Sequence, residues 1–252
     1  MIIGSKILHK NKIYNSLDWA KENIKNAPDG SVFIADEHEF TRGRQNRSWI
    51  FDKDQLVVTL LLKPKNLNNI LPKDLDTRLN QLNMAITLGI LESLKIYNIG
   101  LKWPNDFYYE NYKVGGMISQ VVWQDNKISG IIFAFAINVN NLIKNKNLEF
   151  KACSISEILG HKIDKQDLFQ KSLISINSFY ESWLNFEFDN IFKRWKSEQV
   201  YLGKNIKIHK INGEIVTGKF KDLLDNGDII LEIQNNICEQ IAFNIVENII
   251  II

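Results

Sequence analysis

Three of the five arginines in this chain of 252 residues, Arg42, Arg44 and Arg47, fall within six positions. Arginine presents a planar, permanently charged fork that binds carboxylate or phosphate through paired hydrogen bonds, which lysine does not. Gly43 separates two of these arginines, and glycine lets the backbone come close to a bound group. Trp49 follows and offers a flat ring for stacking. The stretch predicts an anion clamp beside a planar group; a basic surface loop with a core tryptophan is the alternative.

A second group of polar side chains follows a short apolar run at Lys102-Trp-Pro-Asn-Asp106. The proline ends a strand, because it has no backbone N–H for the sheet ladder. Lys102, Asn105 and Asp106 then supply a cation, an amide and a carboxylate at the rim of the sheet. This arrangement favours a polar binding rim, and an ordinary Asn-Asp turn is the alternative.

Two further signals combine apolar strands with groups that need a partner. Lys113 stands two residues before a double glycine, Gly115 and Gly116. A double glycine weakens a strand unless another group approaches its backbone, and the lysine adds a positive charge beside it. Asn138 ends another apolar strand, where a buried amide needs hydrogen-bond partners. For Lys113 and the two glycines, the alternative is a bulge with a solvated lysine. For Asn138, the edge of a purine base is one candidate partner, and a carbonyl of a neighbouring loop is the alternative.

Hydrophobic patterns predict the elements that hold these groups. Short apolar runs predict strands at residues 31–35, 55–62, 100–103, 113–123 and 127–139. Helical spacing predicts helices at 16–26, at 76–96 and across 165–196. Ser16 is the expected N-cap of the first helix, and Ser154 with Glu157 fits a capping box. The polar stretch 36–54 is longer than most loops of compact domains, which favours a functional loop.

The C-terminal part of the chain has a different texture. Short alternating segments follow Val200, separated by the turn pairs Asn212-Gly213 and Asn226-Gly227. We therefore expect an α+β fold. A mixed sheet with helices on one side occupies residues 1–198, and a small β-barrel occupies residues 199–252.

Composition excludes several classes of protein. The chain is 45% hydrophobic, and its 31 basic and 29 acidic residues give a net charge of +2. That balance lacks the basic excess by which proteins bind nucleic acid. The apolar stretches at the N-terminus and at 131–139 are too short for a signal peptide or a membrane span. Cys153 and Cys238 are expected to be buried free thiols in a reducing compartment. We predict a cytoplasmic protein with no nucleic-acid or membrane partner.

In this order and spacing, the motifs resemble those of the biotin protein ligase family. The shared motifs are an Arg-Gly-Arg-x-x-Arg-x-Trp loop, Lys-Trp-Pro-Asn-Asp, Lys-x-Gly-Gly and Ile-Asn-Val-Asn. The resemblance covers nearly the whole chain and implies a class II synthetase-like catalytic domain followed by an SH3-like end domain. Few residues precede the first motif, so we expect the short form without an N-terminal DNA-binding domain.

The resemblance implies a two-step reaction with ATP and biotin as substrates and Mg²⁺ accompanying ATP. Biotin is activated as biotinyl-5'-AMP with release of pyrophosphate and is then transferred to a specific lysine of a biotin carboxyl carrier protein. The ligase is expected to be a monomer or homodimer, with no metal ligands of its own.

The resemblance also implies roles for individual residues. Arg42, Gly43 and Arg44 fold over the ligand, and Lys113 holds the biotin carboxylate or the adenylate phosphate. Lys102 and Asp106 lie near the phosphate and the acceptor lysine. The candidate catalytic residues are Arg42, Arg44, Lys113, Lys102 and Asp106. Among the candidate substrate-binding residues, Gly115 and Gly116 face the biotin rings, and Trp49 and Asn138 lie on the adenine side. The other candidate substrate-binding residues are Asn15 and Ser16 in the first biotin-contact loop, His38, Gly43, Arg47 and Asn105.

Departures from the family pattern lie mostly in the acyl-binding half. Asn15-Ser-Leu17 replaces Ser-Thr-Asn, His38 replaces a glutamine, and Thr41 replaces a glycine. Ala134 and Ala136 also stand where the family usually has glycines. These departures leave two alternatives to a biotin ligase open: a lipoate-type acyl ligase or transferase, and a non-catalytic paralogue that binds an adenylate.

Overall fold

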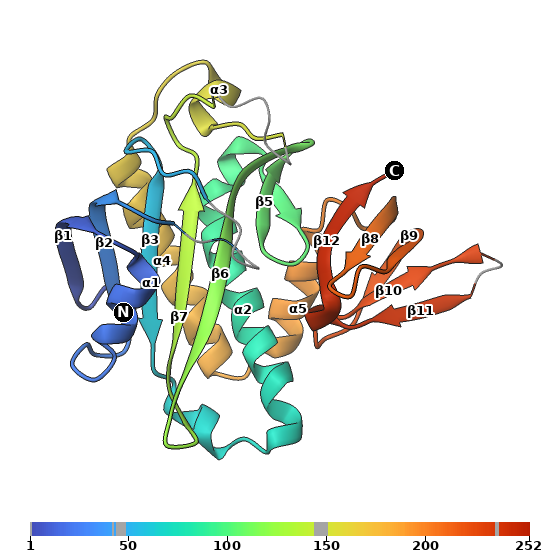
Figure 1. Ribbon diagram of the computed structural model, residues 1–252, viewed down its shortest axis with the longest axis horizontal. Helices are drawn as coiled ribbons and strands as arrows, with labels where there is room; N and C mark the ends of the chain where they lie inside the picture. The colour runs from blue at the N-terminus through green and yellow to red at the C-terminus, as the bar shows by residue number, and fades with distance from the viewer. Residues whose placement is uncertain (1, 42, 44–48, 144–150, 235–236) are drawn as a thin grey trace.

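The computed structural model describes the chain except residues 1, 42, 44–48, 144–150 and 235–236. Its larger sheet has the strand order β1-β2-β3-β7-β6-β5-β4 (Figure 1). β1 pairs with β2 in parallel and every other neighbouring pair is antiparallel, so the sheet is mixed as expected. The strands are β1 (Ile7–Ile13), β2 (Ser31–His38), β3 (Leu56–Leu62), β4 (Gly100–Lys102), β5 (Asp106–Tyr109), β6 (Tyr112–Gln124) and β7 (Lys127–Ile137).

One face of this sheet packs against three helices: α2 (Pro72–Leu94), α4 (Lys165–Leu184) and α5 (Phe188–Ser197). Alternate residues of β3 and β7, among them Leu60 and Phe133, point to this face and are fully buried. Gly89 marks the close contact between α2 and α4, because a Cβ there would lie 2.4 Å from the Cα of Ile176. The largest apolar core of the molecule therefore lies between the sheet and these helices.

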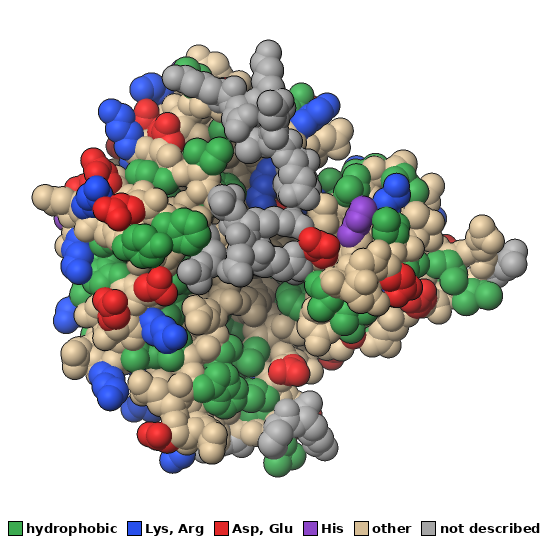
Figure 2. All heavy atoms as spheres, in the orientation of Figure 1, with side chains coloured by type: hydrophobic (Ala, Val, Ile, Leu, Met, Phe, Trp, Pro, Cys, Tyr) green, Lys and Arg blue, Asp and Glu red, His purple; other side chains and the backbone are tan. Residues whose placement is uncertain are grey.

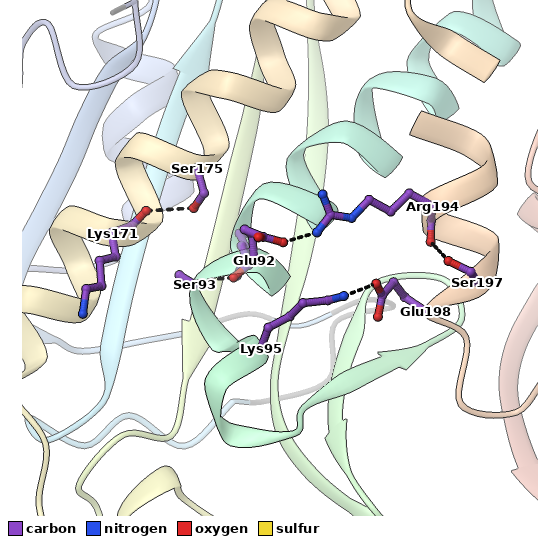
Figure 3. Close-up of polar contacts among 9 residues, drawn as sticks. Glu92, Ser93, Lys95, Lys171, Ser175, Arg194, Ser197 and Glu198 are labelled. Atoms are coloured by element: carbon purple, nitrogen blue, oxygen red, sulfur yellow. Dashed lines mark hydrogen bonds and ion pairs between the residues drawn. The ribbon is translucent and has the colours of Figure 1, made fainter. Parts of the chain in front are cut away.

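Ion pairs join the C-terminal ends of α2 and α5 (Figure 3). Arg194 of α5 pairs with Glu92 of α2, and its guanidinium lies 5.2 Å from the ring centroid of Phe179 in α4. Lys95 pairs with Glu198 at 2.5 Å, one turn further along. These ion pairs are partly exposed, so they contribute little beside the apolar contacts beneath them.

The opposite face of the sheet is covered by α1 (Ser16–Glu22), which corrects the prediction that helices lie on one side only. Trp19 of α1 packs edge-on against Phe33 of β2, with ring centroids 5.1 Å apart. The N-cap is Asn15 rather than Ser16: the Asn15 side chain accepts hydrogen bonds from the backbone N–H of Leu17 and Asp18. The helix brings its N-terminus, with Asn15 and Ser16, to this face of the sheet.

The second sheet is antiparallel and has the order β11-β10-β9-β8-β12. It lies beyond α5 at one end of the molecule (Figure 1). Trp103 donates from Nε1 to the carbonyl of Gly227 at 2.9 Å, and Asn80 donates to the carbonyl of Asn226 at 2.8 Å. A turn of the second sheet is thereby bonded to α2 and to the residue that follows β4. Its strands are β8 (Asn205–Lys210), β9 (Ile215–Leu223), β10 (Ile229–Glu232), β11 (Cys238–Ile241) and β12 (Val246–Ile251); α3 (Ile155–Leu159) and short 3-10 turns at Lys65–Asn69, Lys95–Tyr97 and Phe243–Ile245 complete the elements.

The predicted fold class is confirmed, and the differences are local. The capping box of Ser154 and Glu157 is present at the start of α3. Sequence patterns missed β1, β5 and β12. β1 is an edge strand whose residues are mostly exposed, so it lacks the apolar alternation that signals a strand. β5 follows the Trp-Pro-Asn turn directly and has only four residues.

Neither cysteine forms a disulfide within the described residues, and only Cys153 is partly buried. Burial raises the pKa of the Cys153 thiol to about 12, and the negative charges of Glu157 and Glu110 act in the same direction. Cys238 is exposed, against the expectation of two buried thiols, because β11 is an edge strand of the second sheet. Within the described residues, no helix combines the length and apolar character needed to cross a bilayer.

Gly89→Ala is expected to destabilise the protein by about 1–3 kcal/mol, because the new methyl group meets backbone atoms of α4 that cannot move independently. Urea denaturation followed by circular dichroism measures the change. Ser178→Ala, on an exposed position of α4, is the control and should leave the midpoint unchanged or slightly raised. A raised midpoint for Gly89→Ala would show that the two helices are not in close contact.

Candidate active site

A cavity of about 1120 Å³ lies where the two sheets meet. Its walls come from β6 and β7, from the start of α1, from the segment that leads into β3, and from β12 of the second sheet. Figure 2 shows the face on which the larger sheet and the second sheet adjoin. Basic and acidic side chains are interspersed over the larger body on this face, as the near-neutral composition predicts.

An ion pair occupies one wall of the cavity. The Nζ atom of Lys113 lies 2.8 Å from Oδ1 of Asp106, and both side chains are largely buried. Asp106 lies directly opposite Gly116 in the β5–β6 ladder. A Cβ at Gly116 would lie 2.5 Å from Oδ1 of Asp106, so the missing side chain provides the space for the carboxylate.

A bulge in β6 brings Lys113 to the same face. Phe107 pairs with Gly115, but Tyr108 pairs with Lys113, so Val114 is an extra residue on β6. In a regular strand, Lys113 and Gly116 would lie on opposite faces, because they are three positions apart and side chains alternate. The bulge therefore sets the cation beside the carboxylate of Asp106.

Lys102 is a buried cation between the two sheets, with 4% of its surface exposed. Its Nζ atom lies 3.4 Å from the hydroxyl of Tyr108 and 3.5 Å from Oδ1 of Asn248 in β12. It also lies 5.0 Å and 5.5 Å from the ring centroids of Tyr108 and Tyr201. Aromatic faces and an amide oxygen offset part of the cost of burying this charge. Burial, with the negative charge of Asp106, raises the pKa of Tyr201.

The start of α1 contributes two side chains whose hydrogen bonds differ. Asn15 uses its oxygen to cap the helix and donates from Nδ2 to the carbonyl of Phe40 at 3.2 Å. Ser16 accepts a hydrogen bond from the hydroxyl of Thr59, a fully buried residue, at 2.9 Å. Asn15 therefore orders the wall, while the hydroxyl proton of Ser16 remains for an acceptor in the cavity.

The cavity wall also includes both ends of the predicted anion clamp. The backbone N–H of Trp49 donates to the carbonyl of Thr41 at 3.2 Å, and the Thr41 hydroxyl donates to the carbonyl of Trp49. Thr41 has no positive φ, so the position does not need a glycine. The ring centroid of Trp49 lies 5.8 Å from Nζ of Lys113. The side chain of Thr41, where the family usually has a glycine, thus bonds Thr41 to Trp49.

Most of the predicted site residues line one cavity. Those that do are Asn15, Ser16, Gly43, Trp49, Lys102, Asp106, Lys113, Gly116 and Asn138. Arg42, Arg44 and Arg47 lie outside the described residues. His38, Asn105 and Gly115 do not line the cavity.

The three residues that stay out of the cavity have other contacts. His38 lies behind Phe51, with ring centroids 4.8 Å apart, and burial lowers its pKa, so the ring is neutral at pH 7. The Nδ2 group of Asn105 donates to the carbonyl of Met117, and the backbone carbonyl of Asn105 accepts from the Met117 N–H, which holds β6 in place. Gly115 faces β7, where a Cβ would lie 2.5 Å from the carbonyl oxygen of Ala136.

Sequence reasoning missed several polar residues of the wall. Gln55, Asn141 and Asn248 line the cavity, and Thr59 orients Ser16 from behind. Gln55 and Thr59 interrupt the apolar residues at and before β3, and this polar interruption was the available signal. Asn248 belongs to no motif and reaches the site only because β12 lies beside Lys102.

Comparison with known proteins agrees with this geometry. The profile of the Biotin/lipoate A/B protein ligase family matches residues 8–140. The "Bifunctional ligase/repressor BirA" of Bacillus subtilis is 27% identical over 241 residues, covering 94% of this chain and 72% of that protein. The "Biotin--[acetyl-CoA-carboxylase] ligase" of Paracoccus denitrificans is 22% identical over 221 residues, covering 83% of this chain and 88% of that protein.

The fold has a solved counterpart in the biotin protein ligase of Aquifex aeolicus in complex with biotin and ATP. The two superpose with a TM-score of 0.81 at 24% identity, over 98% of this chain and 99% of that one. The family profile spans more than half of the chain and includes both members of the Lys113–Asp106 pair. This chain belongs to the biotin/lipoate A/B protein ligase family.

Proposed function

We propose that the chain is an ATP-dependent biotin–protein ligase, which forms biotinyl-5'-AMP and transfers the biotinyl group to a lysine of a biotin carboxyl carrier protein. The observation that carries this proposal is the Lys113–Asp106 pair in the wall of a cavity large enough for a nucleotide and a second small molecule. The relative from Paracoccus denitrificans, which is named as a biotin ligase, supports the choice of biotin.

The first step joins two anions. A carboxylate oxygen of biotin forms a bond to the α-phosphorus of ATP, and the bond from that phosphorus to pyrophosphate breaks. Positive charge in the cavity offsets the repulsion between the reactants and stabilises the charge that develops on the phosphate. We assign this work to Lys113 and Lys102, and by prediction from the sequence to Arg42, Arg44 and Arg47.

In the second step the amine of the acceptor lysine attacks the acyl carbon, an amide forms, and AMP leaves. The amine must lose a proton, and Asp106 is the carboxylate that we place next to it. The cavity walls are proposed to shield the mixed anhydride from hydrolysis by water.

The remaining expectations extend this proposal. Mg²⁺ is proposed to enter with ATP, because hard phosphate oxygens are its preferred ligands. The division into a catalytic domain over 1–198 and an end domain over 199–252, a monomeric or homodimeric state and a cytoplasmic location are proposed on the same basis. Val246 to Ile249 line the cavity, so the end domain is proposed to complete the site.

The substrate is tested by incubating the purified protein with MgATP and either biotin, lipoate or octanoate, followed by mass spectrometry of the acyl adenylate. Biotinyl-AMP is the expected product. Lipoyl-AMP in its place would identify the alternative acyl ligase. Binding of synthetic biotinyl-AMP with no turnover of any acid would identify the non-catalytic paralogue.

Lys113→Ala is expected to lower the rate of biotinyl-AMP formation by roughly tenfold to a hundredfold, because a charged hydrogen bond contributes about 1.5–3 kcal/mol. Lys113→Arg should also be impaired, since the planar guanidinium does not reproduce the compact ammonium. Pyrophosphate release measures both rates, and circular dichroism verifies folding. A near-normal rate for Lys113→Ala would show that the biotin carboxylate does not bind at Lys113.

Gly116→Ala is expected to reduce the same rate with little loss of stability. Its methyl group displaces the end of the Asp106 side chain, which is free to move, and thereby separates Asp106 from Lys113. Ser119→Ala, on an exposed position of the same strand, is the control and should retain full activity. If both variants behave alike, the ion pair does not contribute to adenylation.

A further inference from the structure

Gln55 is a buried amide at the cavity wall, with 6% of its surface exposed. It immediately precedes β3, whose first residue, Leu56, pairs with Ile137 of β7. One step further along the same ladder, Gln55 therefore meets Asn138. No catalytic or binding role follows for Gln55 from the motifs, in which it does not take part.

All four hydrogen-bonding positions of the Gln55 amide are used. Oε1 accepts from Nε1 of Trp49 at 3.2 Å and from the backbone N–H of Asp52 at 3.2 Å. Nε2 donates to Oδ1 of Asn138 at 3.0 Å and to the carbonyl of Ile50 at 3.0 Å. A side-chain amide has two acceptor sites and two N–H groups, so the residue is fully satisfied by protein.

These partners determine which way the amide points. Rotating it by half a turn would set N–H groups against the indole N–H of Trp49 and the N–H of Asp52. It would also set the oxygen against two oxygens, those of Asn138 and Ile50. Such a rotation loses every bond, and buried polar groups left unpaired are costly. Gln55 is therefore a rigid connection.

The connection joins the two side chains that we assign to the adenine side of the site. Trp49 lies on the segment that leaves the predicted anion clamp, whereas Asn138 lies at the end of β7. The Asn138 oxygen also accepts from Asn141 at 3.2 Å, and its Nδ2 donates to the carbonyl of Cys153 at 3.3 Å. With the oxygen held in this way, one N–H of Asn138 remains to donate to a ligand.

We propose that Gln55 is the positioning residue of the nucleotide half of the site: it sets the Trp49 indole and the Asn138 amide relative to each other for ATP. This inference rests on the proposed function. Gln55 acts through these two side chains, so its loss weakens ATP binding more than biotin binding. On the acyl side of the site, Thr59 orients Ser16 through a separate hydrogen bond.

Gln55→Met is the test variant, because methionine has a similar length and makes none of the four hydrogen bonds. The KM for ATP is expected to rise about tenfold, while the KM for biotin changes less than about twofold. Gln55→Glu is the second variant. It keeps the acceptor for Trp49 but turns an oxygen toward Asn138, so the KM for ATP should rise here too.

Gln199→Met is the matched control. Gln199 is equally buried, at 6% exposure, and donates to the carbonyl of Trp195 away from the cavity. It should leave both KM values unchanged. Equal rises in the two KM values for Gln55→Met, or the same ATP effect for Gln199→Met, would show that Gln55 contributes only to stability and would overturn the proposal.

Tryptophan fluorescence provides a readout that does not depend on turnover. Gln55→Met should change the tryptophan emission of a protein that is otherwise wild type. The same substitution should leave the emission unchanged in a protein that already carries Trp49→Phe. The double variant Trp49→Phe/Gln55→Met should bind ATP no more weakly than Gln55→Met alone. Additive losses of ATP affinity would overturn the proposal. If the protein binds ATP but forms no biotinyl-AMP, the proposed reaction is refuted. The fluorescence and ATP-affinity measurements still test the role of Gln55, because they do not need turnover.

Discussion

The site depends on one irregularity of the larger sheet, the bulge at Val114. An extra residue in β6 puts Lys113 on the same face as Asp106 and Gly116, and the missing side chain at Gly116 gives the ion pair its space. Bulges recur where a strand must redirect a side chain toward a functional site. Without this bulge, a regular strand would point its lysine to the helical core, where an unpaired ammonium is costly.

Most polar side chains of the cavity wall form hydrogen bonds to other protein groups. Asn15 caps a helix, Gln55 bonds to four protein groups, and Asn138 shares its oxygen between two amides. These bonds hold the remaining donors in place before a ligand arrives, so binding does not have to order them. The cations differ, because Lys113 pairs with a carboxylate whereas Lys102 lies between aromatic rings.

The helical core and the site share the sheet but use opposite faces of it. In β7, Phe133 belongs to the apolar core that also includes residues of α2 and α4, while Ala134 lines the cavity. Small residues at the cavity-facing positions keep the space open, and large ones at the alternate positions fill the core. A two-residue period therefore accounts for both stability and binding in the same strand.

By itself, the sequence determined the fold class, most strand and helix positions, and three charged residues of the cavity wall, Lys102, Asp106 and Lys113, because apolar period, capping and motif spacing are local properties. It failed for β1, whose exposed edge lacks that period, and for the capping role of Asn15. Only the tertiary structure decided which polar groups bond to each other. Gln55 meets Asn138 across 83 positions, and Lys102 meets Asn248 across 146. Such pairs follow from strand register and from the docking of two sheets, which no local pattern records.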